Sequence, residues 1–423
     1  MKRIGFTLIV LFIYKLLTFI PIPLVDTQGM KDFIASDTEG FLSILNTFSG
    51  NALSNFSILA LGISPYITSS IVIQLLQMDI IPIFKEWGDQ GEVGKQKLNK
   101  VTRYVAIALG VVQALVLLLG LSTSKDGIII NESIGQVPVW LAYVYMTVAL
   151  SAGCALILWL SDLITRKGVG NGTSMIIVAG IVTSLPSAAT QLWGTYININ
   201  GTWSTDWTSY VKFGLIVLLY FAVILGTIYV ELANRKIPVQ YANRQGKTDS
   251  NIPMKLNSSG VIPVIFASTL MSIPLTIISV LGLNTTTGAG KWLKLCFSYS
   301  EPIGFIVYIL LIYLFTFFYA FLTINPEKIA DNLQKQNAYI PGVKPGEETE
   351  SFIARVLFKI TIIGGTLLTI LAIIPIITSW IFTLPGAVTI GGTSLLIIVG
   401  VAIETTKQVE TEATEKSYSG FIK

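Results

Sequence analysis

The sequence predicts an all-α integral membrane protein with ten transmembrane helices in two inverted five-helix halves. Hydrophobic residues make up 52% of the 423 residues and charged residues 12%, whereas a soluble domain averages about 25% charged residues. This composition leaves too little polar surface to cover a water-soluble globule of this length. A helix that spans a bilayer needs about 20 apolar residues. Ten stretches qualify, at residues 4–24, 58–78, 104–121, 139–160, 173–193, 213–230, 261–283, 302–325, 360–382 and 384–403.

These stretches carry almost no charge. Lys15 is the only Asp, Glu, Lys or Arg within them, and the chain has no histidine. Proteins that move ions or protons normally keep such groups at membrane depth, so the spans favour an apolar constriction. The first stretch follows Lys2 and Arg3, as in a secretory signal peptide. It is long, however, and it ends at Pro21-Ile22-Pro23 without a small-x-small cleavage site, so we expect a retained helix.

The positive charges predict the orientation. With the N-terminus in the cytoplasm, 22 of the 28 Lys and Arg residues fall on the cytoplasmic side, five fall outside, and the last is Lys15. This bias places both termini in the cytoplasm. Residues 1–193 and 194–423 then hold five spans each, running in opposite directions, which is the topology of an inverted repeat. The two halves share no clear sequence match, so ten helices without internal symmetry remain the alternative.

Three long connections lie on the predicted cytoplasmic side, at residues 79–103, 231–257 and 326–352. Connections longer than about 12–15 residues usually carry function. The third contains a stiff tip rich in Pro and Gly at 340–346. Basic loops next to a membrane can attract anionic lipid, but at this length we favour the docking of a partner. The second connection carries Arg235, Lys236, Arg244, Lys247 and Lys255.

The outer segment 25–57 is half apolar at its centre and too short to span a bilayer. Its residues 41–55 are rich in Ser, Asn and Gly. Irregular backbone at membrane depth is tolerated only inside protein or beside a water-filled cavity. The segment therefore lies on the membrane surface or folds back into the bundle, and its composition leaves both positions open.

We expect neither an enzyme nor a cofactor. The chain has no Walker A loop and no zinc-ligand spacing, and without histidine it has no Ser-His-Asp set. Cys154 and Cys296 are too isolated for a disulfide framework or a metal site. The pattern Gly168-x-Gly170-x-Gly172 opens a membrane helix without a preceding strand, so we interpret it as a tight turn rather than a nucleotide-binding loop.

Two other classes of membrane protein remain as alternatives. A secondary transporter of a small solute also uses inverted repeats, but it would place acids or a polar substrate site at membrane depth. A small-ion channel would show charged rings or a filter lined by carbonyl groups, and neither stands out in the sequence.

Four segments of the chain point to a known family. They are LGISPYITSSIVIQLL at 61–76, GVGNGTSMII at 168–177, GVIPVIFAS at 260–268 and GGTSLLI at 391–397. With NPE at 325–327 and ADNL at 330–333, they make the chain resemble the SecY family, the channel subunits of bacterial protein translocases. The likeness runs in one order from Arg3 to about Gln408.

The resemblance implies a protein-conducting channel. It would pass unfolded secretory polypeptides across the cytoplasmic membrane and release apolar helices sideways into lipid. In the family an hourglass pore is closed at its waist by six apolar side chains, and the matching positions are Ile63, Ile67, Ile177, Ile181, Ile265 and Ile397. Two pairs of these residues are four apart, so each pair would share one face of a helix.

The resemblance also implies two moving parts. The family's plug, a short helix that stops the outer funnel of the idle channel, matches 41–55 and favours the folded-back position for this segment. Its expected residues are Phe41, Leu45, Asn46, Phe48, Ser49, Gly50, Ala52, Leu53 and Asn55. The halves would part at a lateral gate between spans two and three on one side and seven and eight on the other, at Pro65, Thr68, Pro263 and Ser268.

The partners implied are SecE-like and SecG-like small membrane subunits, the SecA motor, the ribosome, signal peptides, nascent chains and membrane lipid. The resemblance makes two loops the docking site for the ribosome or the motor, with the expected contact residues Arg235, Lys236, Arg244, Lys247 and Lys344. Arg and Lys neutralise ribosomal RNA phosphates without reading sequence. The chain departs from the family at Lys344, where arginine is usual, and at Lys15 and Leu17, where arginine and glycine are usual. Because lysine lacks the guanidinium fork, tight docking at the tip around Lys344 is in question.

Overall fold

The computed structural model describes residues 2–23, 25–36, 46–77, 81–123, 138–199, 202–203, 206–241, 250–281, 288–299, 301–382 and 386–419. Its helices are α1 (Lys2–Leu17), α2 (Thr27–Ser36), α4 (Ser64–Gln77), α5 (Pro82–Asp89), α6 (Glu92–Thr123), α7 (Val139–Lys167), α8 (Gly172–Tyr196), α9 (Trp207–Leu232), α10 (Ile262–Leu281), α11 (Gly288–Phe297), α12 (Pro302–Thr323), α13 (Pro326–Lys335), α14 (Glu347–Phe382) and α15 (Gly386–Ser419). Its strands are β1 (Asn198–Ile199), β2 (Thr202–Trp203), β3 (Asn234–Tyr241), β4 (Ser250–Lys255) and β5 (Ala338–Tyr339).

Ten of these helices occupy the ten predicted spans, namely α1, α4, α6, α7, α8, α9, α10, α12, α14 and α15. Within the described residues, six helices are each long and apolar enough to cross a membrane, or seven if the bent pair α4 and α5 counts as one span. Large apolar side chains cover the outward faces: Phe12, Leu218 and Leu310 are 64%, 67% and 62% exposed. Extensive exposed apolar surface of this kind faces a membrane rather than water. The chain is therefore a multi-pass membrane protein.

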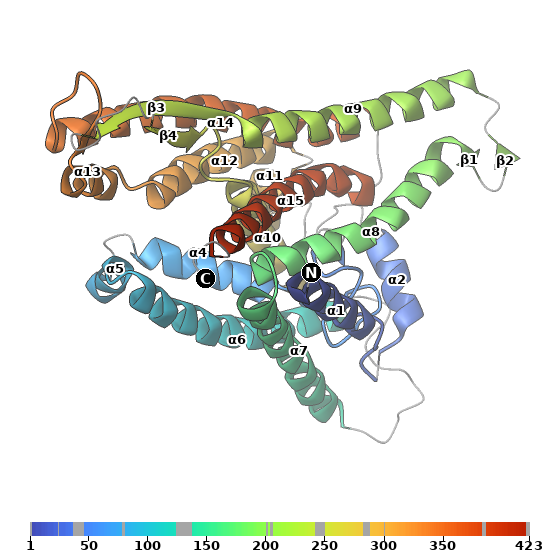
Figure 1. Cartoon of the computed structure of the whole chain (residues 1–423). Helices are drawn as coiled ribbons and strands as arrows, with labels where there is room; N and C mark the ends of the chain where they lie inside the picture. The colour runs from blue at the N-terminus through green and yellow to red at the C-terminus, as the bar shows by residue number, and fades with distance from the viewer. Residues whose placement is uncertain are drawn as a thin grey trace.

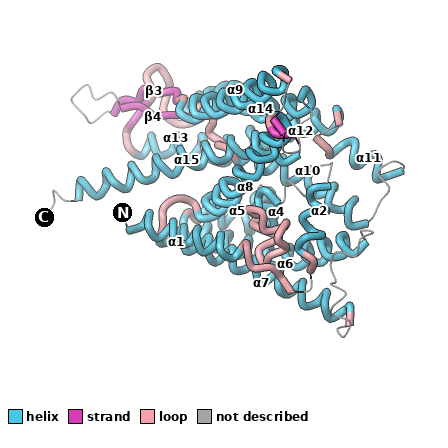
Figure 2. The backbone as a smooth tube through the Cα atoms, turned by 90° about the vertical axis from the view of Figure 1, so that its right-hand side faces the viewer, coloured by secondary structure: helices cyan, strands magenta, loops and turns pink. Residues whose placement is uncertain are grey.

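Three helices lie between two larger groups. Figure 1 shows α4, α5, α6 and α7 in the lower part of the molecule and α9, α12 and α14 in the upper part. Between them, α10 packs against α4 and α6 as well as α12, while α15 packs against α8 and α9. Figure 2, turned by 90°, also places α8 and α10 near the middle. Elements from before and after residue 193 therefore meet along α8, α10 and α15.

The glycine-rich pattern between α7 and α8 is a tight turn, as predicted. Gly170 has a φ of 84°, a left-handed conformation that favours glycine. Asn171 caps α8, because its side chain accepts a hydrogen bond from the Thr173 N–H at 3.1 Å. A Cβ atom at Gly172 would lie 1.9 Å from the Ser161 carbonyl oxygen. Only glycine therefore allows α7 and α8 to approach so closely at this point.

Two long connections meet in a small sheet that the all-α prediction missed. The strands follow the order β4-β3-β5, and both pairs are antiparallel. Ile237 and Val239 of β3 point inward and pack with Leu357 of α14. This alternation of buried and exposed residues covers so few positions that the sequence pattern gives only a weak strand signal. The fold nevertheless remains predominantly helical.

Candidate functional site

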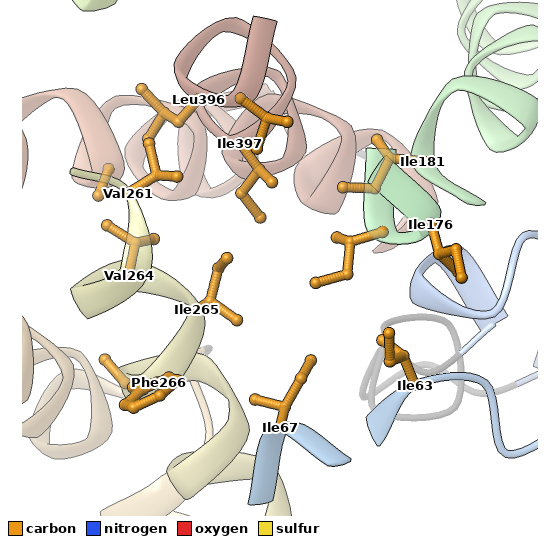
Figure 3. Close-up of a cluster of buried hydrophobic side chains, with 14 of the residues drawn as sticks. Ile63, Ile67, Ile176, Ile181, Val261, Val264, Ile265, Phe266, Leu396 and Ile397 are labelled. Atoms are coloured by element: carbon orange, nitrogen blue, oxygen red, sulfur yellow. The ribbon is translucent and has the colours of Figure 1, made fainter. Parts of the chain in front are cut away.

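The six isoleucines predicted to form a ring lie in one buried cluster. None is more than 8% exposed. Figure 3 shows labelled members of the set arranged around a common centre. They come from the turn before α4 (Ile63), from α4 (Ile67), from α8 (Ile177 and Ile181), from α10 (Ile265) and from α15 (Ile397). Residues more than 300 positions apart in the sequence therefore meet at one point.

Local backbone geometry positions the residues of α4 and α8. Ile63 is the last turn residue before α4, and its carbonyl oxygen accepts hydrogen bonds from the N–H groups of Tyr66 at 3.0 Å and Ile67 at 3.1 Å. The side chains of Ile63 and Ile67 therefore begin one helical turn apart. Ile177 and Ile181 are both buried and share one face of α8, as their spacing predicts.

The centre of the cluster is hydrocarbon. Val264, Phe266 and Leu396 lie beside the isoleucines and belong to the same buried set. A narrow ring of branched apolar side chains sheds water and blocks ions, yet it can yield to a passing chain. Among the residues that the structure describes, no group of three or more His, Cys, Asp or Glu side chains is placed to hold a metal ion. The arrangement suits a seal rather than catalysis.

The outer segment folds back into the bundle. Residues 46–56 are named the insert. Of the predicted plug residues, the buried ones are Ser49, Gly50, Ala52 and Leu53, and the half-buried ones are Asn46, Phe48 and Asn55. Residues 46–48 are helical, and the insert continues from Ser49 as turns. The expected residues Phe41 and Leu45 lie outside the described part of the chain.

Helix α1 holds the backbone of the insert. The Lys15 Nζ donates a hydrogen bond to the Gly50 carbonyl oxygen at 3.2 Å, and the Tyr14 hydroxyl donates one to the Ser49 carbonyl oxygen at 3.1 Å. Both acceptors are main-chain atoms. The contacts therefore depend on where the insert backbone lies rather than on its side chains.

Helix α8 supports the insert from another side. Gly50 has a φ of 69°, and a Cβ atom built there would lie 3.0 Å from the Gly180 Cα. A Cβ atom on Gly180 would lie 2.8 Å from the Phe48 carbonyl oxygen. Phe48 packs against the same buried cluster as the isoleucines. Because Gly180 directly precedes Ile181, the insert rests immediately beside the apolar centre.

A cavity of about 230 Å³ lies where α10 meets α4 and α6. Leu53 of the insert lines it together with the polar side chains of Ser64, Thr68, Gln113, Thr269 and Ser272. Thr68 was a predicted gate residue, whereas the other four polar residues were missed. Gln113 is the only amide side chain in its apolar span, and an isolated polar group at membrane depth is the signal that could have identified it.

A hydrogen bond crosses from α12 to α4 along the same seam. The Tyr319 hydroxyl donates to the Gln74 Oε1 atom, and neither residue was predicted. Of the other gate residues, Pro65 of α4 and Pro263 of α10 are buried. The half-buried Ser268 of α10 donates its hydroxyl hydrogen to the Ile265 carbonyl oxygen at 2.8 Å. The structure thus brings polar contacts to the place where the two groups of helices meet.

Three of the predicted partner-binding cations are described, and they lie on or near the small sheet. Arg235 and Lys236 are exposed on β3. The Lys344 side chain is 83% exposed, and its Nζ lies 3.7 Å from the Glu348 carboxylate. Arg244 and Lys247 lie outside the described residues. Pairing of β5 with β3 brings the two predicted loops together, which the sequence alone did not indicate.

Comparisons with known proteins decide the family. A family model described as SecY matches residues 57–406. The protein translocase subunit SecY of Bacillus licheniformis is 43% identical over 429 residues, which cover 100% of this chain and 96% of the relative. The chain belongs to the SecY family. The SecY subunit of Staphylococcus aureus strain NCTC 8325 is 44% identical and covers 99% of this chain and 96% of its own length.

Solved structures agree with the fold expected of the SecY family. One described as a protein conducting channel has a TM-score of 0.64 at 18% identity, covering 97% of this chain and 92% of that chain. A SecY structure described by its plug domain gives 0.66 at 19% identity with the same coverage. Sec61 from a canine ribosome-channel complex gives 0.61 at 17% identity, covering 97% and 92%. Membership of the SecY family excludes an enzyme and leaves the secondary-transporter alternative without support.

Proposed function

We propose that this chain is the protein-conducting channel of a Sec-type translocase. It passes unfolded secretory polypeptides across the cytoplasmic membrane and releases apolar helices sideways into lipid. The observation that carries this proposal is the buried meeting of six isoleucines at the centre of a bundle with an apolar exterior. Membership of the SecY family supports the same function.

In this proposal the six isoleucines form the waist of an hourglass pore. Packed together, branched apolar side chains exclude water and ions. Because α4, α8, α10 and α15 each carry part of the ring, the ring widens when these helices move apart around a threading chain. The insert acts as the plug, since its backbone lies against Gly180 beside Ile181.

The lateral gate in this proposal is the seam between α4 and α6 on one side and α10 and α12 on the other. The cavity at this seam and the bond from Tyr319 to Gln74 support it. Burying an apolar helix in hydrocarbon is favourable by tens of kcal/mol in gross area terms, at roughly 25 cal/mol per Å². The channel therefore only has to give a signal peptide access to lipid.

The proposal also assigns the orientation and the partners. The halves 1–193 and 194–423 form an inverted pair in the cytoplasmic membrane, with both termini in the cytoplasm, as the 22 cations on that side indicate. SecE-like and SecG-like subunits bind within the membrane. The SecA motor or the ribosome docks on the hairpin of β3 and β4 and on the tip around Lys344, where exposed cations suit phosphate.

The first test weakens the pore ring. We replace Ile67 and Ile265 together with serine and reconstitute the full chain in vesicles. Polar side chains at the waist let water enter, so potassium efflux should rise well above that of the unchanged protein. In cells, export of a precursor with a weakened signal sequence should improve, because the closed state loses apolar packing.

The matched control replaces two isoleucines that face outward. Ile306 and Ile363 are 56% and 53% exposed, so Ile306→Ser with Ile363→Ser makes the same chemical change away from the centre. This pair should neither leak nor improve export. Equal potassium efflux from the unchanged chain and the Ile67 and Ile265 variant would exclude the pore ring.

A further inference from the structure

The one cation within the predicted spans has a specific partner in the insert. A charged side chain at membrane depth is costly, so it is normally paired with another group. The Lys15 Nζ donates to the Gly50 carbonyl oxygen at 3.2 Å and lies 4.7 Å from the centre of the Phe19 ring. Both contacts suit an ammonium group. The Lys15 ammonium group therefore contacts both the insert and Phe19, which lies two residues beyond the end of α1.

Two further hydrogen bonds join the same pieces of chain. The Tyr14 hydroxyl, which is buried, donates to the Ser49 carbonyl oxygen at 3.1 Å. In the opposite direction, the Asn55 Nδ2 donates to the Thr18 carbonyl oxygen at 3.3 Å. All three bonds run between residues 14–18, at the end of α1, and residues 49–55 of the insert. They form one continuous strip of contact.

Two of the insert residues in this strip, Ser49 and Gly50, lack an apolar side chain. Ser49 and Gly50 present no large side chain, and on the α8 side Gly180 meets the insert backbone directly. Hydrophobic burial therefore contributes little at these two residues. Hydrogen bonds in a region of low dielectric are stronger than in water, and a bond from an ionised donor is roughly twice as strong as a neutral one.

We propose that Lys15 and Tyr14 form a latch that sets how readily the insert leaves the pore. This inference rests on the proposed function, in which the insert is the plug. Both latch hydrogen bonds are accepted by main-chain oxygens of neighbouring residues. They therefore break together when the insert moves away and re-form together when it returns. Residue 15 is then a specificity-determining position, because a stronger latch demands a stronger signal sequence before the channel opens.

The test measures how often the insert leaves its site. In a full-length chain with Cys154→Ala and Cys296→Ser, the fully buried Ala52 is changed to cysteine, and its reaction with a maleimide is timed in membranes. Adding Lys15→Met should speed labelling roughly tenfold, the equivalent of losing one hydrogen bond to a charged group. Tyr14→Phe, which removes a single oxygen atom, should speed it by a smaller factor. Lys15→Arg should restore slow labelling.

The control is Lys31→Met, which removes an exposed lysine from α2 and should leave the rate unchanged. Slow labelling in both Lys15→Met and Tyr14→Phe would overturn the latch.

The potassium efflux of the Ile67 and Ile265 variant, measured in parallel, separates the latch proposal from the proposed channel function. If that variant leaks while the latch variants label slowly, the channel stands and the latch fails. If that variant is tight, the proposed function fails, and the latch fails with it.

Discussion

At the scale of single residues, two glycines decide how closely the insert can approach α8. Gly50 has a left-handed backbone conformation that other residues rarely adopt. Gly180 offers a bare helix surface against which the Phe48 carbonyl oxygen rests. The insert can therefore lie against α8 because Gly50 and Gly180 have no side chains. A Cβ atom added at either residue would push the two backbone segments apart.

Replacing Gly180 with alanine should loosen the insert. The new Cβ atom would lie 2.8 Å from the Phe48 carbonyl oxygen, and overpacking of this kind typically costs about 1–3 kcal/mol. We expect faster potassium efflux from vesicles and better export of precursors with weakened signals.

The matched control is Gly194→Ala in the same helix, because a Cβ atom there would meet nothing within 4 Å. It should behave as the unchanged protein. If Gly180→Ala and Gly194→Ala have the same efflux, the insert does not seal against α8.

The sequence could place the six isoleucines but could not assign Lys15 its partner. The isoleucines fall in segments whose order and spacing match a family, and their four-residue spacing is a local property of helices. The bond from Lys15 to Gly50 joins residues 35 positions apart. This bond depends on how the insert folds back against α1. The insert consists largely of turns, and no periodic sequence pattern predicts the course of such a backbone.

At the scale of elements, α10 occupies the decisive position. It carries Ile265 of the central cluster, and it packs against α4 and α6 on one side and α12 on the other. The bond from Tyr319 to Gln74 ties α12 to α4 across the same seam. In the proposed function, movement at this seam therefore changes the pore ring and the lateral gate together.

Replacing Tyr319 with phenylalanine should make the seam easier to open. The change leaves the Gln74 amide without this donor in the closed state, whereas in the open state water can satisfy it. Loss of such a bond costs about 1 kcal/mol, or roughly fivefold in the opening equilibrium. Membrane insertion of a test helix of borderline hydrophobicity should rise accordingly.

Tyr229→Phe removes a hydroxyl from a residue that is 73% exposed and should leave insertion unchanged. Insertion that is unchanged or reduced in Tyr319→Phe would show that this bond does not hold the seam closed.

The elements themselves were predictable to different degrees. The ten spans followed from hydropathy, because a bilayer imposes both length and composition on a helix. The β3 and β4 hairpin was not predicted, since Ile237 and Val239 give only one cycle of alternation. The turns at residues 49–56 were not predicted, because Ser, Asn and Gly fix no single backbone conformation in advance.

At the scale of the whole molecule, the small sheet joins two connections that lie far apart in the chain. Tyr241 pairs with Ala338 and Gln240 with Tyr339. The exposed cations of β3 and the tip around Lys344 therefore belong to one structural unit, which is stabilised by packing against α14. In the proposed function, a partner that docks on one connection therefore lies beside the other.

Replacing Arg235 and Lys236 with alanine should weaken ribosome binding in a salt-dependent way. The logarithm of the binding constant falls linearly with the logarithm of the salt concentration, and each cation that contacts phosphate makes this slope steeper by about one. Removing two such cations should therefore make the slope shallower by about two. Sedimentation of vesicles with ribosomes at several salt concentrations measures this.

The control is Lys212→Ala with Lys291→Ala, two exposed lysines on the predicted outer side. A salt slope that is the same for both pairs would place the ribosome contact elsewhere.

The way α1 holds the insert has a consequence for sequence divergence. Lys15 and Tyr14 grip carbonyl oxygens that every amino acid possesses. These two bonds therefore tolerate a change of side chain at Ser49. Gly50 is different, because its φ of 69° and its closeness to Gly180 exclude a side chain. Lineages should thus vary at Ser49 more readily than at Gly50.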